Sequence, residues 1–128
     1  MLYHELTNTI IGLSFEIMNE LGVGFLESVY QKSLLIALEK KGFIIHSEVS
    51  FPVLFRGTNV GNFRADLIVE RKIILEIKAV DKIIGVHKAQ VINYLKAINL
   101  PIGLIINFGQ PKIQTARLQH PNSFSISS

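Results

Sequence analysis

The hydrophobic pattern of the chain changes its period close to Gly42. Before Gly42, apolar residues such as Leu6, Ile10 and Leu13 recur every three or four positions, which predicts amphipathic helices. After Gly42, alternating and continuously apolar runs that are rich in β-branched residues predict strands. We therefore expect two helices, the second over 26–41, followed by a sheet region.

The sheet region divides into strands and one further helix. Pro52 indicates an edge or a bulge in its first strand run. Gly57, Asn59 and Gly61 indicate the turn after that run. We expect one or two strands over 43–55, single strands over 63–69, 72–79 and 101–107, a helix over 86–98, and an edge strand over 112–118. This order, with its crossover helix, predicts an α/β fold with a mixed sheet.

A chain of 128 residues fits one domain. We place that domain at residues 1–120 and expect a loose C-terminal tail over 121–128. The mean hydropathy of +0.37 is high for a small protein, and either a sheet buried on both faces or an apolar oligomer interface explains it. No apolar run approaches the ~18–20 residues that span a membrane. Since no basic leader precedes Glu5, we expect a cytoplasmic protein with no membrane partner.

The composition excludes several kinds of site. The chain has no cysteine, which excludes a disulfide scaffold, a thiolate zinc site and a cysteine nucleophile. Residues 1–48 hold six acidic and three basic residues, a net charge of −3, whereas residues 49–128 hold four acidic and ten basic residues, a net charge of +6. The basic C-terminal part suits a polyanion such as nucleic acid, or it is a solvated lysine-rich surface.

Two carboxylates and a lysine fall on neighbouring predicted strands. Asp66 lies inside an apolar strand, where a carboxylate is costly to bury unless it is paired or holds a cation. Glu76 and Lys78 are two residues apart in the next strand and so share a face. A tight hairpin at Glu70 and Arg71 would place Asp66 opposite Glu76. Such a group can hold Mg²⁺ and stabilise charge on a phosphate, or it is a structural salt bridge.

The helices add further polar candidates. Gln90 and Tyr94 are four residues apart and share a helix face, where neutral donors can hold a phosphate or a base, or form an ordinary polar border. Glu27 and Tyr30 share a face at the start of the second helix. A glutamate in a first turn is favourable for the helix dipole in any case.

These residues together resemble a known family. Gly24-x-x-Glu27-x-x-Tyr30 is similar to the signature of the GxxExxY family, and Asp66, Glu76-x-Lys78 and Gln90-x-x-x-Tyr94 follow in that family's order. The resemblance covers residues 5–118, and the family looks like a branch of the PD-(D/E)XK nuclease superfamily. It implies a restriction-endonuclease-like core of helix, three strands, helix and strand, here with an extra N-terminal helix.

The resemblance also implies roles for the site residues. Asp66, Glu76 and Glu27 would be metal ligands, and Lys78 would be the catalytic lysine beside these catalytic carboxylates. Substrate would contact Tyr30, Gln90 and Tyr94, whereas Ala65 stands where the superfamily has a proline that carries no chemistry.

The expected function is that of a nuclease that uses Mg²⁺, or Mn²⁺, and acts on nucleic acid, with DNA favoured over RNA. A catalytically weak or inactive nucleic-acid-binding or assembly module with the same fold is the main alternative, and a phosphate-handling hydrolase of small substrates is another. A chain this short has little room for a recognition domain, so sequence specificity would require a homodimer or a partner protein.

Overall fold

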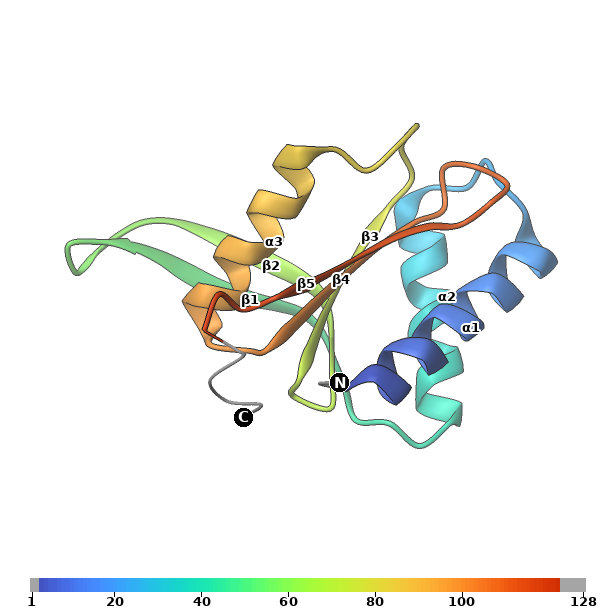
Figure 1. The fold of residues 1–128 in the computed structure, drawn as a ribbon, viewed down its shortest axis with the longest axis horizontal. Helices are drawn as coiled ribbons and strands as arrows, with labels where there is room; N and C mark the ends of the chain where they lie inside the picture. Colours follow the sequence, from blue (N-terminus) through green and yellow to red (C-terminus); the bar gives the residue numbers. More distant parts are fainter. Residues whose placement is uncertain (1–2, 123–128) are drawn as a thin grey trace.

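The computed structural model describes residues 3–122, which form one five-stranded sheet with helices on both faces (Figure 1). The strands are in the order β1-β2-β3-β4-β5, and only β3 and β4 are parallel. The elements in chain order are α1 (His4–Leu21), α2 (Glu27–Lys40), β1 (Ile45–Phe55), β2 (Thr58–Val69), β3 (Ile73–Lys78), α3 (Gly85–Ile98), β4 (Ile102–Asn107) and β5 (Gln114–Gln119). The mixed α/β fold predicted from the pattern is confirmed.

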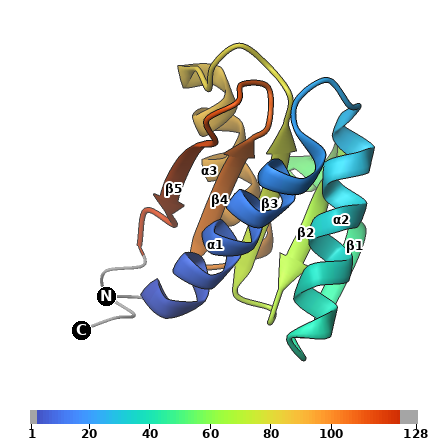
Figure 2. The same ribbon diagram turned by 90° about the vertical axis from the view of Figure 1, so that its right-hand side faces the viewer.

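The sheet separates two hydrophobic clusters. Helices α1 and α2 cover one face, and α3 covers the other (Figure 2). Along β3 the buried side chains alternate, with Ile73 and Leu75 in the α1–α2 cluster and Ile74 in the α3 cluster. All six residues of β4 are buried. A sheet buried on both faces therefore accounts for much of the high hydropathy.

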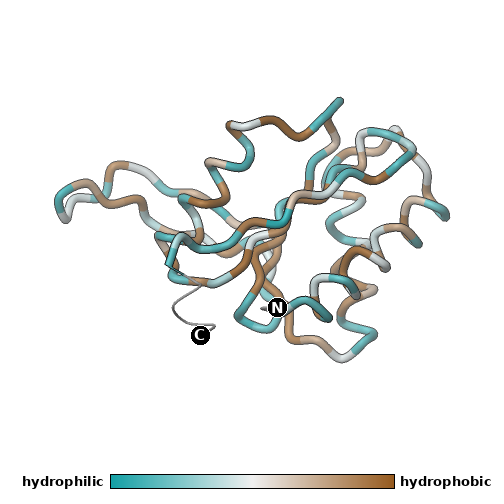
Figure 3. Tube along the Cα trace, in the orientation of Figure 1, coloured by the Kyte–Doolittle hydropathy of each residue, from teal (hydrophilic) through white to brown (hydrophobic). Residues whose placement is uncertain are grey.

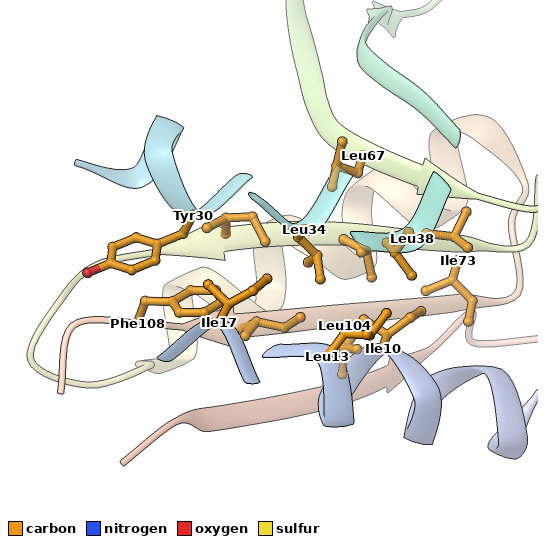
Figure 4. Close-up of a cluster of buried hydrophobic side chains, with 14 of the residues drawn as sticks. Ile10, Leu13, Ile17, Tyr30, Leu34, Leu38, Leu67, Ile73, Leu104 and Phe108 are labelled. Atoms are coloured by element: carbon orange, nitrogen blue, oxygen red, sulfur yellow. The ribbon is translucent and has the colours of Figure 1, made fainter. Parts of the chain in front are cut away.

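The larger cluster fixes the two N-terminal helices against the sheet (Figure 4). Ile10 of α1 and Leu34 of α2 are both fully buried there, as is Leu104 of β4. Burial of each such side chain contributes about 1.5–3 kcal/mol relative to leaving it in water. This packing sets where the first residue of α2 meets the end of β3.

The β1–β2 hairpin differs from its prediction. β2 begins at Thr58 rather than at residue 63, and the turn consists of Arg56 and Gly57, which both have positive φ. This is the geometry that two-residue hairpins favour. Asn59 and Gly61, predicted as turn residues, instead lie within β2 where the register shifts, and the Asn59 Oδ1 accepts the Gly61 N–H at 2.9 Å. The asparagine thus stabilises a bulge.

Two other predictions concern the edges of the molecule. β1 is an edge strand, which confirms the interpretation of Pro52. The loose tail predicted over 121–128 lies outside the described residues from residue 123 onward. No helix within residues 3–122 has both the length and the apolar character needed to cross a membrane.

Candidate active site

β2 and β3 separate at Asp66. The two strands pair only from Val69 opposite Ile73 to Leu67 opposite Leu75. One residue further, the same register brings Asp66 across from Glu76, as predicted. There β2 leaves β3 and continues outward paired with β1 alone.

The Asp66 side chain closes the ladder at this fork. Its Oδ2 accepts the backbone N–H of Ile77 at 2.8 Å, in place of a main-chain carbonyl. The main-chain oxygen of Asp66 accepts a hydrogen bond from Gln31 of α2 at 3.2 Å. The carboxylate is therefore held in a fixed position at the boundary between the buried sheet and the projecting hairpin.

Glu76 is the buried member of the carboxylate pair. It is 7% exposed and lies on the α3 face of β3, between the buried residues Leu75 and Ile77. Burial raises its pKa from 4.5 to about 9, and the hydrogen bond with Asp66 and the negative charge of Asp66 add to this rise. Without a cation, the protonated Glu76 therefore donates a hydrogen bond to Asp66.

Lys78 ends β3 on the same face as Glu76. It is half-buried, and its positive charge lowers the pKa of Glu76, opposing the effect of burial. The Lys78 carbonyl accepts the N–H of Phe108 at 2.8 Å, which fixes the backbone at this point. The ammonium group is thus placed where it can meet negative charge near the two carboxylates.

Glu27 approaches the site from the other side of the sheet. It is the first residue of α2, and its Oε2 accepts the N–H of Ala79 at 3.1 Å. Its negative charge adds a small contribution to the raised pKa of Glu76. The structure therefore brings Glu27 to the end of β3, where it holds the residue that follows Lys78.

α3 brings Tyr94 and Gln90 to the carboxylates. The two side chains are hydrogen-bonded to each other. Burial raises the pKa of Tyr94, and the charges of Glu76 and Asp66 raise it further. The Tyr94 ring also stacks on Phe63 of β2, with ring centroids 4.0 Å apart. These contacts place both predicted α3 residues beside the pair.

Tyr30 does not lie on the site surface. It is fully buried and stacks on Phe108 with ring centroids 4.5 Å apart. Its hydroxyl donates to the Gly22 carbonyl at 2.6 Å and accepts the Phe25 N–H at 3.3 Å. A fully buried ring offers no surface to a substrate, so the geometry gives the predicted substrate contact no support. Tyr30 instead fixes the loop that leads into Glu27.

Asn107, at the end of β4, has a structural role that the sequence pattern does not predict. It is fully buried, and its amide exchanges two hydrogen bonds with Val80, at 2.9 Å to the Val80 N–H and 2.8 Å to the Val80 carbonyl. A Cβ at Gly109 would clash with this same Val80 backbone. Asn107 thus fixes the loop after Lys78, and the signal that could have revealed it is an asparagine inside a continuously apolar strand.

The predicted three-carboxylate metal site is not assembled. Within residues 3–122, no three histidine, aspartate or glutamate side chains form a group that could hold a metal ion. Glu27 accepts the Ala79 N–H through Oε2, and the two carboxyl groups that contact each other are those of Asp66 and Glu76. Mg²⁺ in proteins is often bound through one or two carboxylates and several waters, so the pair fits such a cation.

Known proteins resemble this chain in family and in fold. The family model of the PD-(D/E)XK nuclease superfamily matches residues 4–118. Among solved structures, the crystal structure of SSO0001 has a TM-score of 0.52 and 18% sequence identity, with 96% of this chain and 87% of that chain covered. At that identity the likeness concerns the fold alone. No curated protein matches the chain. Because the family match spans residues 4–118 of the 128 and includes every candidate residue, the chain belongs to the PD-(D/E)XK nuclease superfamily.

Proposed function

We propose that the protein is a Mg²⁺-dependent nuclease that hydrolyses phosphodiester bonds in DNA. The observation that carries this proposal is the Asp66–Glu76 pair at the sheet fork, with Lys78 on the same face. Superfamily membership supports metal-dependent nuclease chemistry. The basic charge of residues 49–128 supports a polyanionic substrate.

Each site residue has a task that its contacts support. Asp66 and Glu76 would hold the cation, which requires Glu76 to lose its proton. When bound, the cation would acidify a water and stabilise negative charge on the phosphate. Lys78 would meet that negative charge directly, while Gln90 and Tyr94 would orient the phosphate as neutral donors.

We further propose that the chain belongs to the GxxExxY branch, because each motif residue has a distinct structural part. Gly24 has a φ of 106°, which an L side chain rarely adopts. Glu27 holds Ala79, and Tyr30 ties down the loop from Gly22 to Phe25. The motif thus joins α2 to the end of β3, and Glu27 acts there as a positioning residue.

The decisive experiment measures cleavage of linear, circular and single-stranded DNA, and of RNA, with Mg²⁺ or Mn²⁺. We expect Asp66→Asn and Lys78→Met to lose activity by about 100-fold or more, since each removes charge at the reacting phosphate. Asp81→Asn and Lys82→Met are matched controls in the exposed loop after β3, and they should cleave like the wild type. Equal cleavage by all five proteins would reject the proposed site.

A catalytically weak nucleic-acid-binding module is the second candidate. The observation in its favour is that Glu76, with a pKa of about 9, already satisfies Asp66 without a cation. Mg²⁺ calorimetry separates the two functions. Binding that disappears in Asp66→Asn supports the nuclease, whereas the absence of Mg²⁺ binding to the wild type supports the binding module.

A further inference from the structure

The tip of the β1–β2 hairpin projects beyond the sheet as a two-stranded ribbon (Figure 1). We name residues 52–62 the arm. Every residue of the arm is exposed, so neither of its faces packs on the core. A two-stranded ribbon without a covered face is marginally stable in water. The fold therefore extends β1 and β2 into solvent without an internal packing reason.

The arm carries exposed apolar side chains on both strands beside its polar turn, and the hydropathy colouring shows brown segments behind a hydrophilic tip (Figure 3). Leu54 is 61% exposed, Phe55 is 59% exposed and Val60 is 61% exposed. The guanidinium of Arg56 lies 4.9 Å from the centroid of the Phe55 ring. This tip offers a cation, an aromatic ring and aliphatic side chains within a few residues.

The charge of the arm has one sign. Between Glu48 and Asp66, the only charged residues are Arg56 in the turn and Arg64 near the fork. Arginine binds phosphate oxygens, and apolar side chains such as phenylalanine contact the thymine methyl group in the major groove. A second copy of this chain fits the tip less well, because a symmetric dimer of two arms would gather two Arg56 side chains in one interface with no acidic residue of either arm to pair with them.

The base of the arm is joined firmly to the site. β2 runs without a break from the arm to Asp66. Three residues before Asp66, the ring of Phe63 contacts the rings of both Phe51 and Tyr94, with centroids 5.2 Å and 4.0 Å away. The stack links both strands of the hairpin to α3, so the arm has a defined direction relative to the carboxylate pair.

We propose that the arm is a nucleic-acid-binding element that inserts into the major groove of duplex DNA next to the site. A two-stranded β-ribbon fits that groove, which is about 12 Å wide. Arg56 would contact phosphates, and Phe55 with Leu54 would contact base edges. This inference deepens the proposed function and rests on it for the position of the scissile phosphate, but binding by the arm is measured separately.

The test compares two arginines that occupy similar turns. Arg56 and Arg71 both have positive φ in exposed hairpin turns at opposite ends of β2. Arg56→Glu is the test variant and Arg71→Glu is its control. Binding to a short fluorescent duplex is measured by anisotropy in EDTA at several salt concentrations, and hydrolysis of bis(p-nitrophenyl) phosphate, which is too small to reach the arm, is measured with Mg²⁺.

We expect Arg56→Glu to weaken duplex binding by about tenfold or more and to reduce the salt slope by about one. Arg71→Glu should bind like the wild type, and any change in hydrolysis of the small ester should be much smaller than the change in duplex binding. Phe55→Ser should also weaken binding, with a smaller change in the salt slope, because it removes no charge.

Three outcomes would overturn the inference: wild-type duplex binding by Arg56→Glu, equal weakening in Arg71→Glu, or a wild-type dimer that Phe55→Ser converts to a monomer without a change in duplex binding. The proposed function fails separately. If the wild type hydrolyses neither DNA nor the small ester, yet Arg56→Glu alone loses duplex binding, the arm binds nucleic acid and the site is not a nuclease.

Discussion

The two halves of β2 lie in opposite environments. From Ala65 to Val69 the strand is almost entirely buried between the helices, whereas from Thr58 to Asn62 every residue is exposed. The hairpin turns at both ends use positive φ, so the turns themselves do not distinguish the halves. The two halves differ in their neighbouring strands, because the inner half pairs with β3 and β1, whereas the outer half pairs with β1 alone. Asp66 stands where one environment becomes the other.

This comparison teaches where chemistry can be placed on such a sheet. A carboxylate in the buried half would lack water and a route for substrate, and one on the exposed half would lack rigid partners. At the boundary, Asp66 has a fixed hydrogen bond to Ile77 and a partly exposed side chain. The site is therefore rigid and accessible together.

The largest expected effect comes from truncating the same residue type in each half of the hairpin. Leu67→Ala should lower the free energy of unfolding by about 2–5 kcal/mol, because it leaves a cavity in the core. Leu54→Ala, in the arm, should change it by no more than about 0.5 kcal/mol. Urea denaturation measures both, and similar losses in the two variants would mean that the arm is packed in solution.

The pH dependence of stability tests whether Glu76, opposite Asp66 at the fork, is protonated in the folded protein. The folded pKa of Glu76 is about 9, above the unfolded 4.5, so the folded protein holds a proton that the unfolded chain releases between these values. The metal-free protein should therefore lose stability as the pH rises from about 4.5 to 9. The neutral variant Glu76→Gln should be about 1–3 kcal/mol more stable than the wild type at pH 8.

The control for this pH profile is Glu48→Gln, which changes an exposed carboxylate in β1. In denaturation series at several pH values, the free energy of unfolding of this variant should fall with pH as steeply as that of the wild type. Parallel profiles for wild type and Glu76→Gln would show that Glu76 is ionised in the folded protein.

A smaller effect should separate the two functions of Asp66. Asp66→Ala removes the acceptor of the Ile77 N–H and should lower the free energy of unfolding by about 1–3 kcal/mol. Asp66→Asn keeps an oxygen acceptor and should retain most of that stability while losing cleavage. Denaturation and cleavage assays on both variants check this. An equal loss of stability in both would mean that the hydrogen bond from Ile77 to Asp66 does not stabilise the fold.

The smallest effect concerns the joint between the arm and α3. A double-mutant cycle with Phe63→Leu and Tyr94→Leu should give a coupling of about 0.5–1.5 kcal/mol from the stacked rings. The cycle is measured by urea denaturation, with Phe55→Leu and Tyr94→Leu as the uncoupled reference pair. A coupling near zero would mean that the arm is not fixed to α3.

Sequence alone could predict the elements and the Asp66–Glu76 opposition because both follow from short-range rules. Hydrophobic period marks helices and strands, and a turn centred on Arg71 fixes the register of its hairpin. The fork could not be predicted, since it depends on how far β2 follows β1 rather than β3. Asn59 and Gly61 were assigned to a turn because a bulge uses the same residue types as a turn.

Tyr30 and Asn107 show a different limit of prediction from sequence, which concerns the surroundings of single side chains. Helical spacing correctly groups Tyr30 with Glu27, but at a helix N-terminus the spacing does not indicate whether a side chain faces the core or the site. The role of Asn107 cannot be predicted from the pattern because its partner Val80 is 27 residues away in sequence. Contacts of that range arise from tertiary packing, which no local pattern encodes.

The contacts of Asn107 also bear on when the site comes into existence during synthesis. A domain generally folds as a unit, so its tertiary contacts form only when the elements that make them have been synthesised. A chain that ends before β4 has made Asp66, Glu76 and Lys78, but it lacks the strand beside Glu76 and the side chain that holds Val80. The candidate site residues are thus translated well before they can be arranged, and the growing chain acquires the geometry of the site only as its last strands join the sheet.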